Sequence, residues 1–248
     1  MVKILLGFNC NCFTNRYDEP EEWARIFAEL GIGHVMFSID LIDPYWPWAV
    51  QKNLCDRTLK ACRDNDVEVR CSFGGHHNHQ HYLGHPDEEV RRHAEDWFKR
   101  CIDQTAYLGG KSFGTCFAIQ TCKAHHDKKL RAKILAEAIE TYYRLGDYAA
   151  EAGLEALAYE MTSVERESCA TFQENDDVLE RCSKMAVPMK ICLDMGHRNL
   201  AGLPEEANHL EWIRRYGARC DVIDCQQTDL TASHHWPFTE HYNTKGII

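Results

Sequence analysis

The sequence predicts an α/β protein built as a (β/α) TIM barrel that lacks the eighth strand and helix at its C-terminus. Short apolar runs alternate with longer amphipathic segments along the 248 residues, which indicates a parallel sheet with helical crossovers. Repeated right-handed crossovers of this kind close into a barrel unless the topology reverses. No linker, repeat or low-complexity run interrupts the alternation, so we expect one incomplete barrel domain over residues 1–248.

Seven apolar runs of strand length, each followed by a polar residue or a glycine, predict the strands. The predicted strands cover residues 3–9, 34–39, 68–73, 111–119, 155–160, 187–194 and 221–224. The first of them has the composition of a buried strand. After the seventh, no further strand and helix follow before the Ile247-Ile248 tail. We therefore expect an open seam between strands one and seven, with unpaired backbone edges.

Six amphipathic segments with helix boundary signals predict the helices between these strands. The first opens at residues 18–22, where a capping residue, an early proline and acids of the first turn occur together, and it stops at Gly31. The third begins with Asp87 and two glutamates, and the fourth is closed by Gly153. The predicted helices cover residues 18–30, 52–64, 86–108, 127–152, 174–185 and 204–216.

Charge and composition exclude several classes of protein. The net charge is −10 and no basic stripe is present, which argues against a nucleic-acid partner. No apolar run reaches the ~20 residues that a membrane span needs. Because the chain carries 13 cysteines but opens without a secretory signal, we expect reduced thiols and a cytoplasmic location. Cys10 and Cys12 form a close pair, but the second pair of a zinc site is missing.

Three acidic residues end consecutive predicted strands. Glu160, Asp194 and Asp224 close the fifth, sixth and seventh. The carboxyl ends of barrel strands meet at one face, and adjacent strands lie ~4.8 Å apart, so the three carboxylates can converge on one ion. Oxygen-rich ligation suits a single divalent metal ion, with Mn²⁺ favoured and Mg²⁺ or Co²⁺ as alternatives. His197 lies in the loop just after Asp194.

A divalent ion at this position suits the removal of a proton from a small ketose. The ion would polarise the carbonyl and its neighbouring hydroxyl, and a carboxylate beside it can take the acidic α-proton. Glu160 is the candidate base, and His197 is placed to hold a substrate oxygen. Reprotonation of the metal-held enediolate would give an epimer or an aldose. The sequence therefore predicts an epimerase or isomerase of a small ketose or ketose phosphate.

Three motifs carry a resemblance to a known superfamily. They are Glu160-Met-Thr-Ser163 after strand five, Asp194-Met-Gly-His197 after strand six and Asp224-Cys-Gln-Gln-Thr-Asp229 after strand seven. In this order and spacing they resemble the xylose-isomerase-like sugar isomerase and epimerase superfamily, whose fold is a TIM barrel. The resemblance covers essentially the whole chain.

Two later segments resemble one branch of that superfamily. Residues 164–167 and 234–239, followed by Asn243 and Gly246, look like the branch that epimerises erythrulose phosphates. The resemblance implies that the partner of this protein is a small sugar or sugar phosphate.

The resemblance also implies roles for the residues at the strand ends. It makes Glu160 a metal ligand and base, Asp194 a metal ligand, and His197 a substrate contact. Asp224 stands where relatives usually have a ligating histidine, so the site gains a negative charge. The superfamily supplies a fourth ligand, a glutamate on strand eight that also acts as base on the opposite face, and no predicted strand of this chain carries it.

Five more residues are implied as substrate contacts. Arg166 is placed to grip a phosphate through its guanidinium fork, and a surface role is its alternative. Gln226 and Gln227 are expected to hydrogen-bond substrate hydroxyls. His235 and Trp236 are expected to close the pocket, with a simple packed loop as the alternative.

Two other functions stay open at this point. One is a non-catalytic sugar-binding or sugar-phosphate-binding barrel that lacks the second base. The other is an endonuclease IV-like nuclease, which Asp224 and the negative net charge disfavour. The histidine-rich stretch at 76–85 is expected to be a polar loop at the barrel mouth rather than a metal site. The open hydrophobic seam favours a homo-oligomer over a monomer.

Overall fold

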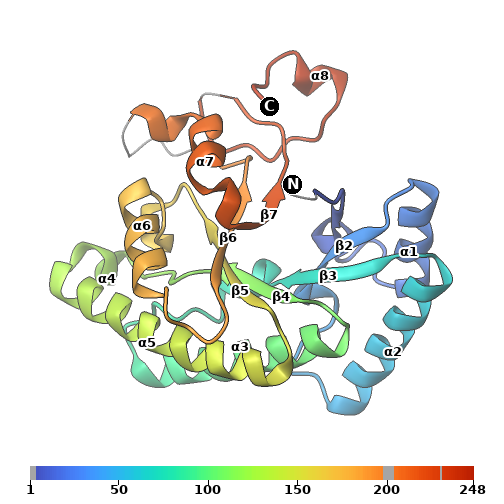
Figure 1. Cartoon of the computed structure of the whole chain (residues 1–248), viewed down its shortest axis with the longest axis horizontal. Coiled ribbons are helices and arrows are strands. Elements are labelled where there is room, and N and C mark those ends of the chain that lie inside the picture. The colour runs from blue at the N-terminus through green and yellow to red at the C-terminus, as the bar shows by residue number, and fades with distance from the viewer. Residues whose placement is uncertain (1–3, 198–203, 230) are drawn as a thin grey trace.

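Seven parallel strands form one sheet at the centre of the protein. The computed structural model describes residues 4–197, 204–229 and 231–248. Strands that follow one another along the chain lie side by side, in the order β1 to β7 (Figure 1). They are Phe8–Asn9 (β1), His34–Ser38 (β2), Glu68–Phe73 (β3), Ser112–Cys116 (β4), Ala156–Met161 (β5), Met189–Asp194 (β6) and Cys220–Asp224 (β7). The order confirms the predicted α/β class, a TIM barrel with seven strands in the described ranges.

Helices surround this sheet (Figure 1). The α-helices are Pro20–Glu29 (α1), Trp48–Asp64 (α2), Glu88–Tyr107 (α3), Cys122–His126 (α4), Lys128–Ala152 (α5), Phe172–Arg181 (α6), His209–Tyr216 (α7) and Glu240–Asn243 (α8). Short 3₁₀ turns are Cys10–Phe13 (η1), Ile39–Leu41 (η2), Gly75–His79 (η3), Glu165–Glu167 (η4), Pro204–Ala207 (η5) and Gly217–Arg219 (η6). Four of these turns, η1 to η4, directly follow strands or their loops, and they shape the chain at the carboxyl ends of β1, β2, β3 and β5.

Helix boundaries follow the capping signals at some positions and depart from them at others. Asp127 caps α5 by accepting hydrogen bonds from the next backbone amides, and Gly153 ends the helix with a φ of 88°. At α1 the N-cap residue is Glu19, whose side chain makes no capping hydrogen bond. The side chain of Asp18 instead accepts a hydrogen bond from the backbone amide of Asn15. The helix predicted at 204–216 is divided into η5 and α7, since Asn208 caps a new helix start.

Two clusters of buried apolar side chains pack on the sheet. The larger one joins β4, β5 and β6 to α3, α5, α6 and α7, and the smaller joins η1, β2 and β3 to α1 and α2. In the larger cluster Phe117 stacks on Tyr142 at 4.9 Å between ring centroids. The stack connects the segment after β4 to the long helix α5, and so fixes that end of the barrel. Both clusters pack on the same sheet. That the chain forms a single domain over residues 1–248 stays a prediction.

The first predicted strand is the main correction to the fold. Of its described residues only Phe8–Asn9 forms a strand, and Ile4 and Leu6 are 87% and 77% exposed, so the expectation of a buried strand over residues 3–9 is wrong. Residue 3 lies outside the described residues. The physical reason is the lack of a second neighbour, because β1 pairs only with β2 and its other edge is open.

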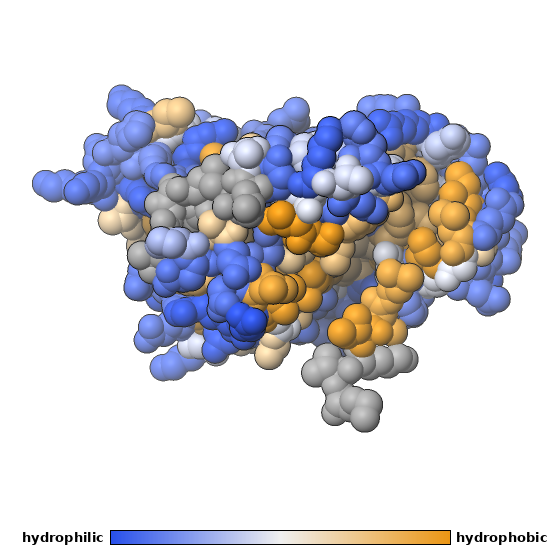
Figure 2. All heavy atoms as spheres, turned by 90° about the horizontal axis from the view of Figure 1, so that it is seen from above, coloured by the Kyte–Doolittle hydropathy of each residue, from blue (hydrophilic) through white to orange (hydrophobic). Residues whose placement is uncertain are grey.

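The opposite edge of the sheet is β7, which among the described residues pairs only with β6. Ile223 on this strand is 39% exposed, and Ile247 and Ile248 of the C-terminal tail are exposed as well. Figure 2 shows apolar side chains gathered across this face of the molecule between polar margins. A single side-chain hydrogen bond of 3.1 Å, from Asn9 Nδ2 to Asp224 Oδ2, links the ends of β1 and β7. Within the described part of the chain, no helix is long and apolar enough to cross a membrane.

Candidate metal and substrate site

Strand register brings the predicted acidic residues to one face of the sheet. Glu160 of β5 is paired with Cys192 of β6, and Asp194 of β6 is paired with Asp224 of β7. Residues that are paired across parallel strands, and residues two apart on one strand, point to the same side. The side chains of Glu160, Asp194 and Asp224 therefore share a face at the carboxyl ends of their strands.

Asp194 is the most deeply buried of these acids, at 4% exposed. Its Oδ1 accepts a hydrogen bond of 2.6 Å from the amide of Gly196, and its Oδ2 accepts one of 2.9 Å from Nε2 of Gln226. These donors fix the carboxylate without using all of its lone pairs. Two imidazoles face the same Oδ2, with His235 Nδ1 at 3.5 Å and His197 Nε2 at 4.0 Å.

Glu160 approaches the same nitrogen of His197 that faces Asp194. Its Oε1 is 3.5 Å from His197 Nε2, and its Oε2 is 3.9 Å from the thiol of Cys116. The side chain of Glu160 is 15% exposed, so it is sheltered but not fully closed off from solvent. The Nε2 atom of His197 thus faces two carboxylates, one from β5 and one from β6.

Asp224 is held apart from this pair by its own partner. Its Oδ2 accepts the hydrogen bond from Asn9, a residue for which the sequence gave no signal beyond a polar side chain at a strand end. Burial raises the pKa of Asp224, the bond from Asn9 opposes that rise, and the charge of Glu160 adds to it. Asp224 therefore belongs to the same electrostatic site as Glu160.

Charge in the site is dominated by the carboxylates. Burial raises the pKa of Asp194, and the neighbouring Glu160 raises it further. Burial alone would lower the pKa of His197, but the hydrogen bond and charge of Glu160, with Asp194, outweigh burial and raise it. A set of carboxylates and imidazoles of this kind, with Asp194 buried and His235 exposed at its outer side, is suited to a divalent cation.

One group of side chains in the described ranges has the spacing of a metal site. The donor atoms of Asp194, His197 and His235 all lie within 4.8 Å of one another. Glu160 is adjacent to this group through His197, and Asp224 through Glu160. The sequence predicted the ion to lie among Glu160, Asp194 and Asp224, and that ligand set stays a prediction.

The second imidazole comes from the segment after β7. Gln227 and Trp236 form an antiparallel bridge with two hydrogen bonds of 2.9 Å, which turns the chain back over the strand ends. This turn brings His235 edge-to-face against His197, with the ring centroids 4.9 Å apart. The sequence placed His235 near the pocket but carried no signal for which of His234 and His235 points inward.

The other predicted substrate contacts are distributed around this centre. Arg166 lies in η4, 40% exposed, and its Nη2 is 3.7 Å from Glu167 Oε1. Gln226 binds Asp194 directly. The amide of Gln227 is buried and is bonded to the backbone of Ile248 at 2.8 and 2.9 Å, so it fastens the C-terminal tail.

Trp236 stacks on two other aromatic rings of the segment after β7. Its ring lies 4.2 Å from that of His234 and 5.0 Å from that of Tyr242. Glu167, which the sequence reasoning did not select, is 7% exposed and lies 3.5 Å from His79 of η3. The signal available in the sequence was an acid next to Arg166 in the segment after the fifth predicted strand.

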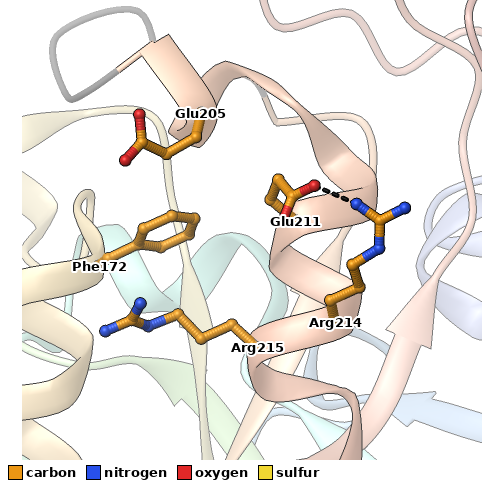
Figure 3. A pocket seen from close by; sticks show the side chains of 5 residues that line it. All are labelled: Phe172, Glu205, Glu211, Arg214 and Arg215. Atoms are coloured by element: carbon orange, nitrogen blue, oxygen red, sulfur yellow. Dashed lines mark hydrogen bonds and ion pairs between the residues drawn. The ribbon is translucent and has the colours of Figure 1, made fainter.

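A separate hollow of about 420 Å³ lies between α6 and α7 (Figure 3). It is lined by Phe172, Glu205, Glu211, Arg214 and Arg215. Both arginines are already paired, Arg214 with Glu211 and Arg215 with Asp176. None of the predicted site residues lines this hollow, so its volume says nothing about the chemistry at the strand ends.

Comparisons with known proteins find a matching family and a curated relative. The family described as xylose isomerase-like TIM barrel matches residues 14–248. A curated D-erythrulose 1-phosphate 3-epimerase from Brucella abortus is 30% identical over 251 aligned positions, which cover 100% of this chain and 81% of that protein.

Solved structures share the fold. A candidate xylose isomerase from Rhodospirillum rubrum superposes with a TM-score of 0.89 at 24% identity, covering 99% of this chain and 83% of that one. A D-psicose 3-epimerase from Clostridium cellulolyticum, solved with D-tagatose, superposes with a TM-score of 0.63 at 14% identity, covering 87% and 71%. These two similarities show a shared fold, that is, a shared arrangement of strands and helices.

Proposed function

The chain belongs to the xylose isomerase-like TIM-barrel family and is an enzyme of its epimerase and isomerase class, and we propose that it acts on a small ketose or ketose phosphate. The observation that carries this proposal is the placement of Glu160, Asp194 and His197 around one buried point at the strand ends. The 30% identity to an erythrulose phosphate epimerase supports a four-carbon ketose phosphate as the first substrate to test.

The proposed chemistry is the transfer of one proton next to a carbonyl. A divalent ion held by Asp194 would supply Lewis acidity toward the substrate carbonyl oxygen. An oxygen of Glu160 takes the proton from the α-carbon, while the electron pair of the C–H bond forms the double bond of an enediolate. Delivery of a proton from solvent to the other face of that carbon inverts it, and the proton on Glu160 is then lost to solvent. Return to the former carbonyl carbon gives an aldose instead.

The surrounding side chains have supporting parts in this proposal. Gln226 holds the carboxylate of Asp194 through its 2.9 Å hydrogen bond. Arg166, exposed on η4, supplies a guanidinium for a substrate phosphate. Trp236 covers the outer side of the mouth, and Gln227 keeps the covering segment in place by fastening the tail.

The proposed setting is the cytoplasm. All 13 cysteines are free thiols, and many of them are core side chains, such as Cys71 and Cys192. Such thiols persist in a reducing compartment. A small sugar or sugar phosphate is the proposed ligand, and the open edges of β1 and β7 support association of copies of the chain.

The test is exchange of the substrate α-proton with solvent. The chain is incubated with Mn²⁺ and erythrulose phosphate in D₂O, and deuterium at the α-carbon is followed by NMR. We expect exchange in the native chain and its loss in Glu160→Gln, because the amide cannot take a proton. Glu155→Gln is the matched control, since Glu155 lies just before the same strand at its other end and its side chain is 70% exposed.

The outcomes separate the candidate functions. Loss of exchange in Glu160→Gln, with full exchange in Glu155→Gln, supports the proposal. Equal exchange rates in both variants would contradict the role of Glu160. Thermal stabilisation by the sugar phosphate without any exchange in the native chain would instead support a binding barrel that does not turn its ligand over.

A further inference from the structure

We propose that His79 and Arg166 together bind the phosphate group of a ketose phosphate, and that Glu167 is the positioning residue that holds these two cations side by side. This inference rests on the proposed function, because it names the part of the same site that selects a phosphorylated ketose over a free one. The sequence predicts Arg166 as a phosphate contact. The roles of His79 and Glu167 are new to this assignment.

Two cationic side chains converge on one buried carboxylate oxygen. His79 Nε2 lies 3.5 Å and Arg166 Nη2 lies 3.7 Å from the same atom, Oε1 of Glu167. Both distances exceed those of ordinary N–H···O hydrogen bonds, and within the described ranges neither cationic side chain donates one. The two nitrogens are therefore close enough for two oxygens of one phosphate group to contact both, and their N–H donors are available to it.

Exposure and charge around this group favour an anion. The side chain of Glu167 is 9% exposed, whereas those of His79 and Arg166 are 55% and 40% exposed. A ligand that arrives from solvent therefore meets the cations before the carboxylate. When the imidazole is protonated, the three side chains carry one net positive charge, in a chain whose net charge is −10. Local positive charge of this kind attracts a small phosphorylated ligand even on an acidic protein.

Glu167 lies within electrostatic range of the reacting groups. Burial lowers the pKa of His197, but the nearby carboxylates raise it, Glu160 most and Glu167 among the others. Burial raises the pKa of the Cys116 thiol, and the charges of Glu160 and Glu167 add to that rise. His197 and Cys116 both lie against the carboxylate of Glu160, at 3.5 and 3.9 Å. The cation pair is therefore beside the candidate base.

The turn η3, which ends at His79, is fixed to its surroundings by two buried side chains. Asp40 has a side chain that is 4% exposed, and it accepts a hydrogen bond of 2.8 Å from the amide of His76. Asn78 is 2% exposed and accepts a hydrogen bond from the hydroxyl of Thr115 on β4. The histidine-rich stretch is thus packed at this turn. An imidazole on a fixed turn loses little conformational freedom when it binds a ligand.

Two glycines before the turn make room for these buried side chains. A Cβ atom on Gly75 would lie 2.3 Å from Oδ2 of Asp40, and one on Gly74 would lie 2.0 Å from Oδ1 of Asn78. Gly75 also has a φ of 57°, which favours glycine. The Gly-Gly pair therefore allows the close packing that directs η3 toward the end of β4.

Arg166 is fixed from the other side, in the turn η4. The backbone amide of Gln120, in the segment after β4, donates a hydrogen bond of 2.7 Å to the carbonyl of Arg166. The hydroxyl of Ser168, just after η4, donates one of 3.0 Å to the carbonyl of Ala118. The segments after β3, β4 and β5 thus meet at this point, and the two cations come from turns that lie far apart in the sequence.

The experiment compares erythrulose phosphate with free erythrulose. Calorimetry gives the affinity for each ketose, and exchange of the α-proton gives KM and kcat. In His79→Gln we expect the affinity for the phosphate ester to fall roughly tenfold or more, as loss of a hydrogen bond to a charged group does. KM for the ester should rise while kcat and the affinity for free erythrulose stay unchanged, because the lost contact is remote from the reacting carbon.

His76→Gln is the matched control. His76 lies on the same turn and is exposed, and within the described ranges its imidazole pairs with no carboxylate. We expect its affinities for both ketoses to equal those of the native chain. An equal loss of phosphate affinity in His76→Gln and His79→Gln would overturn the assignment, and so would an equal loss of affinity for the two ketoses in His79→Gln.

A second variant tests the positioning role. Glu167→Gln keeps the size of the side chain and removes the charge that draws the two cations together, so we expect the preference for the phosphate ester to fall. If Glu167 acts through His79, adding His79→Gln to Glu167→Gln should cost less than His79→Gln costs alone. Additive losses, or an unchanged or increased preference in Glu167→Gln, would overturn this role.

The outcomes also separate this inference from the proposed reaction. Phosphate preference that depends on His79, in a chain that exchanges no α-proton, would leave the phosphate site standing and reject the epimerase proposal. Normal exchange in a chain whose phosphate affinity is unaffected by His79→Gln would do the reverse. A native chain with no preference for the phosphorylated ketose would reject the phosphate site.

Discussion

Single residues decide how closely distant parts of the chain meet at the strand ends. Gly196 allows the ring of His235 to approach the turn after β6, and Asn9 fixes Asp224 from the first strand. Gly196 and Asn9 act on His235 and Asp224, two side chains that the sequence analysis already selected. Neither role is visible from a local pattern, because each partner lies far away along the chain.

The first prediction concerns Gly196. In Gly196→Ala the added Cβ would lie 2.5 Å from Nδ1 of His235 and 3.0 Å from Oδ1 of Asp194, so the imidazole must turn away and the carboxylate is crowded. We expect Co²⁺ affinity to fall by roughly tenfold or more, measured by calorimetry. Gly217→Ala is the control, since its Cβ would touch only Ile213 at 3.6 Å. Equal losses in the two variants would show that the effect is not specific to the approach of His235.

At the scale of elements, the turn between β5 and α6 depends on one buried amide. Ser168 and Cys169 have φ angles of 66° and 59°, which non-glycine residues rarely adopt. Asn175 of α6 donates to the carbonyls of Cys169 and Thr171 at 2.8 and 2.7 Å, and it accepts from Tyr159 at 3.0 Å. The helix therefore holds the strained turn in the shape that places η4 beside the site.

The second prediction follows from this amide. Asn175→Ala removes the side-chain donor to the carbonyl of Cys169 and the acceptor of the Tyr159 hydroxyl, while the carbonyl of Thr171 keeps its bond from the backbone amide of residue 175. Each unsatisfied buried group costs about 1–3 kcal/mol. We expect the free energy of unfolding to fall by roughly 2–4 kcal/mol in urea titrations. Asp177→Ala on the same helix, where the side chain is 55% exposed, should change it by less than about 0.5 kcal/mol. A small loss in both would mean that the turn is stable without the amide.

At the scale of the whole molecule, the sheet has two open edges. β1 pairs only with β2 and β7 only with β6, and exposed apolar side chains lie along both (Figure 2). Unpaired strand edges with apolar flanks readily pair with other chains. Among the described residues, the hydrogen bond from Asn9 to Asp224 links the ends of these two edge strands.

The third prediction tests these edges. We expect the chain to associate as its concentration rises, and the paired substitutions Leu6→Lys and Ile223→Lys to reduce that association, because charge on an edge opposes strand pairing. The measurement is sedimentation velocity over a range of concentrations. Leu30→Lys is the control, since Leu30 is 63% exposed at the end of α1 and belongs to neither edge strand. The same decrease in the control would attribute association to general hydrophobicity instead.

Local patterns along the sequence determined the alternation of strands and helices, the caps of α5, and the acids that end β5, β6 and β7. These features depend on periodicity, on backbone capping and on strand polarity, all of which are properties of neighbouring residues. Tertiary structure decided which of two adjacent histidines faces Asp194, that Gln227 binds the tail, and that residues before Phe8 are exposed. Those outcomes depend on contacts between segments far apart in the sequence, and no local pattern encodes the partner at the other end of such a contact.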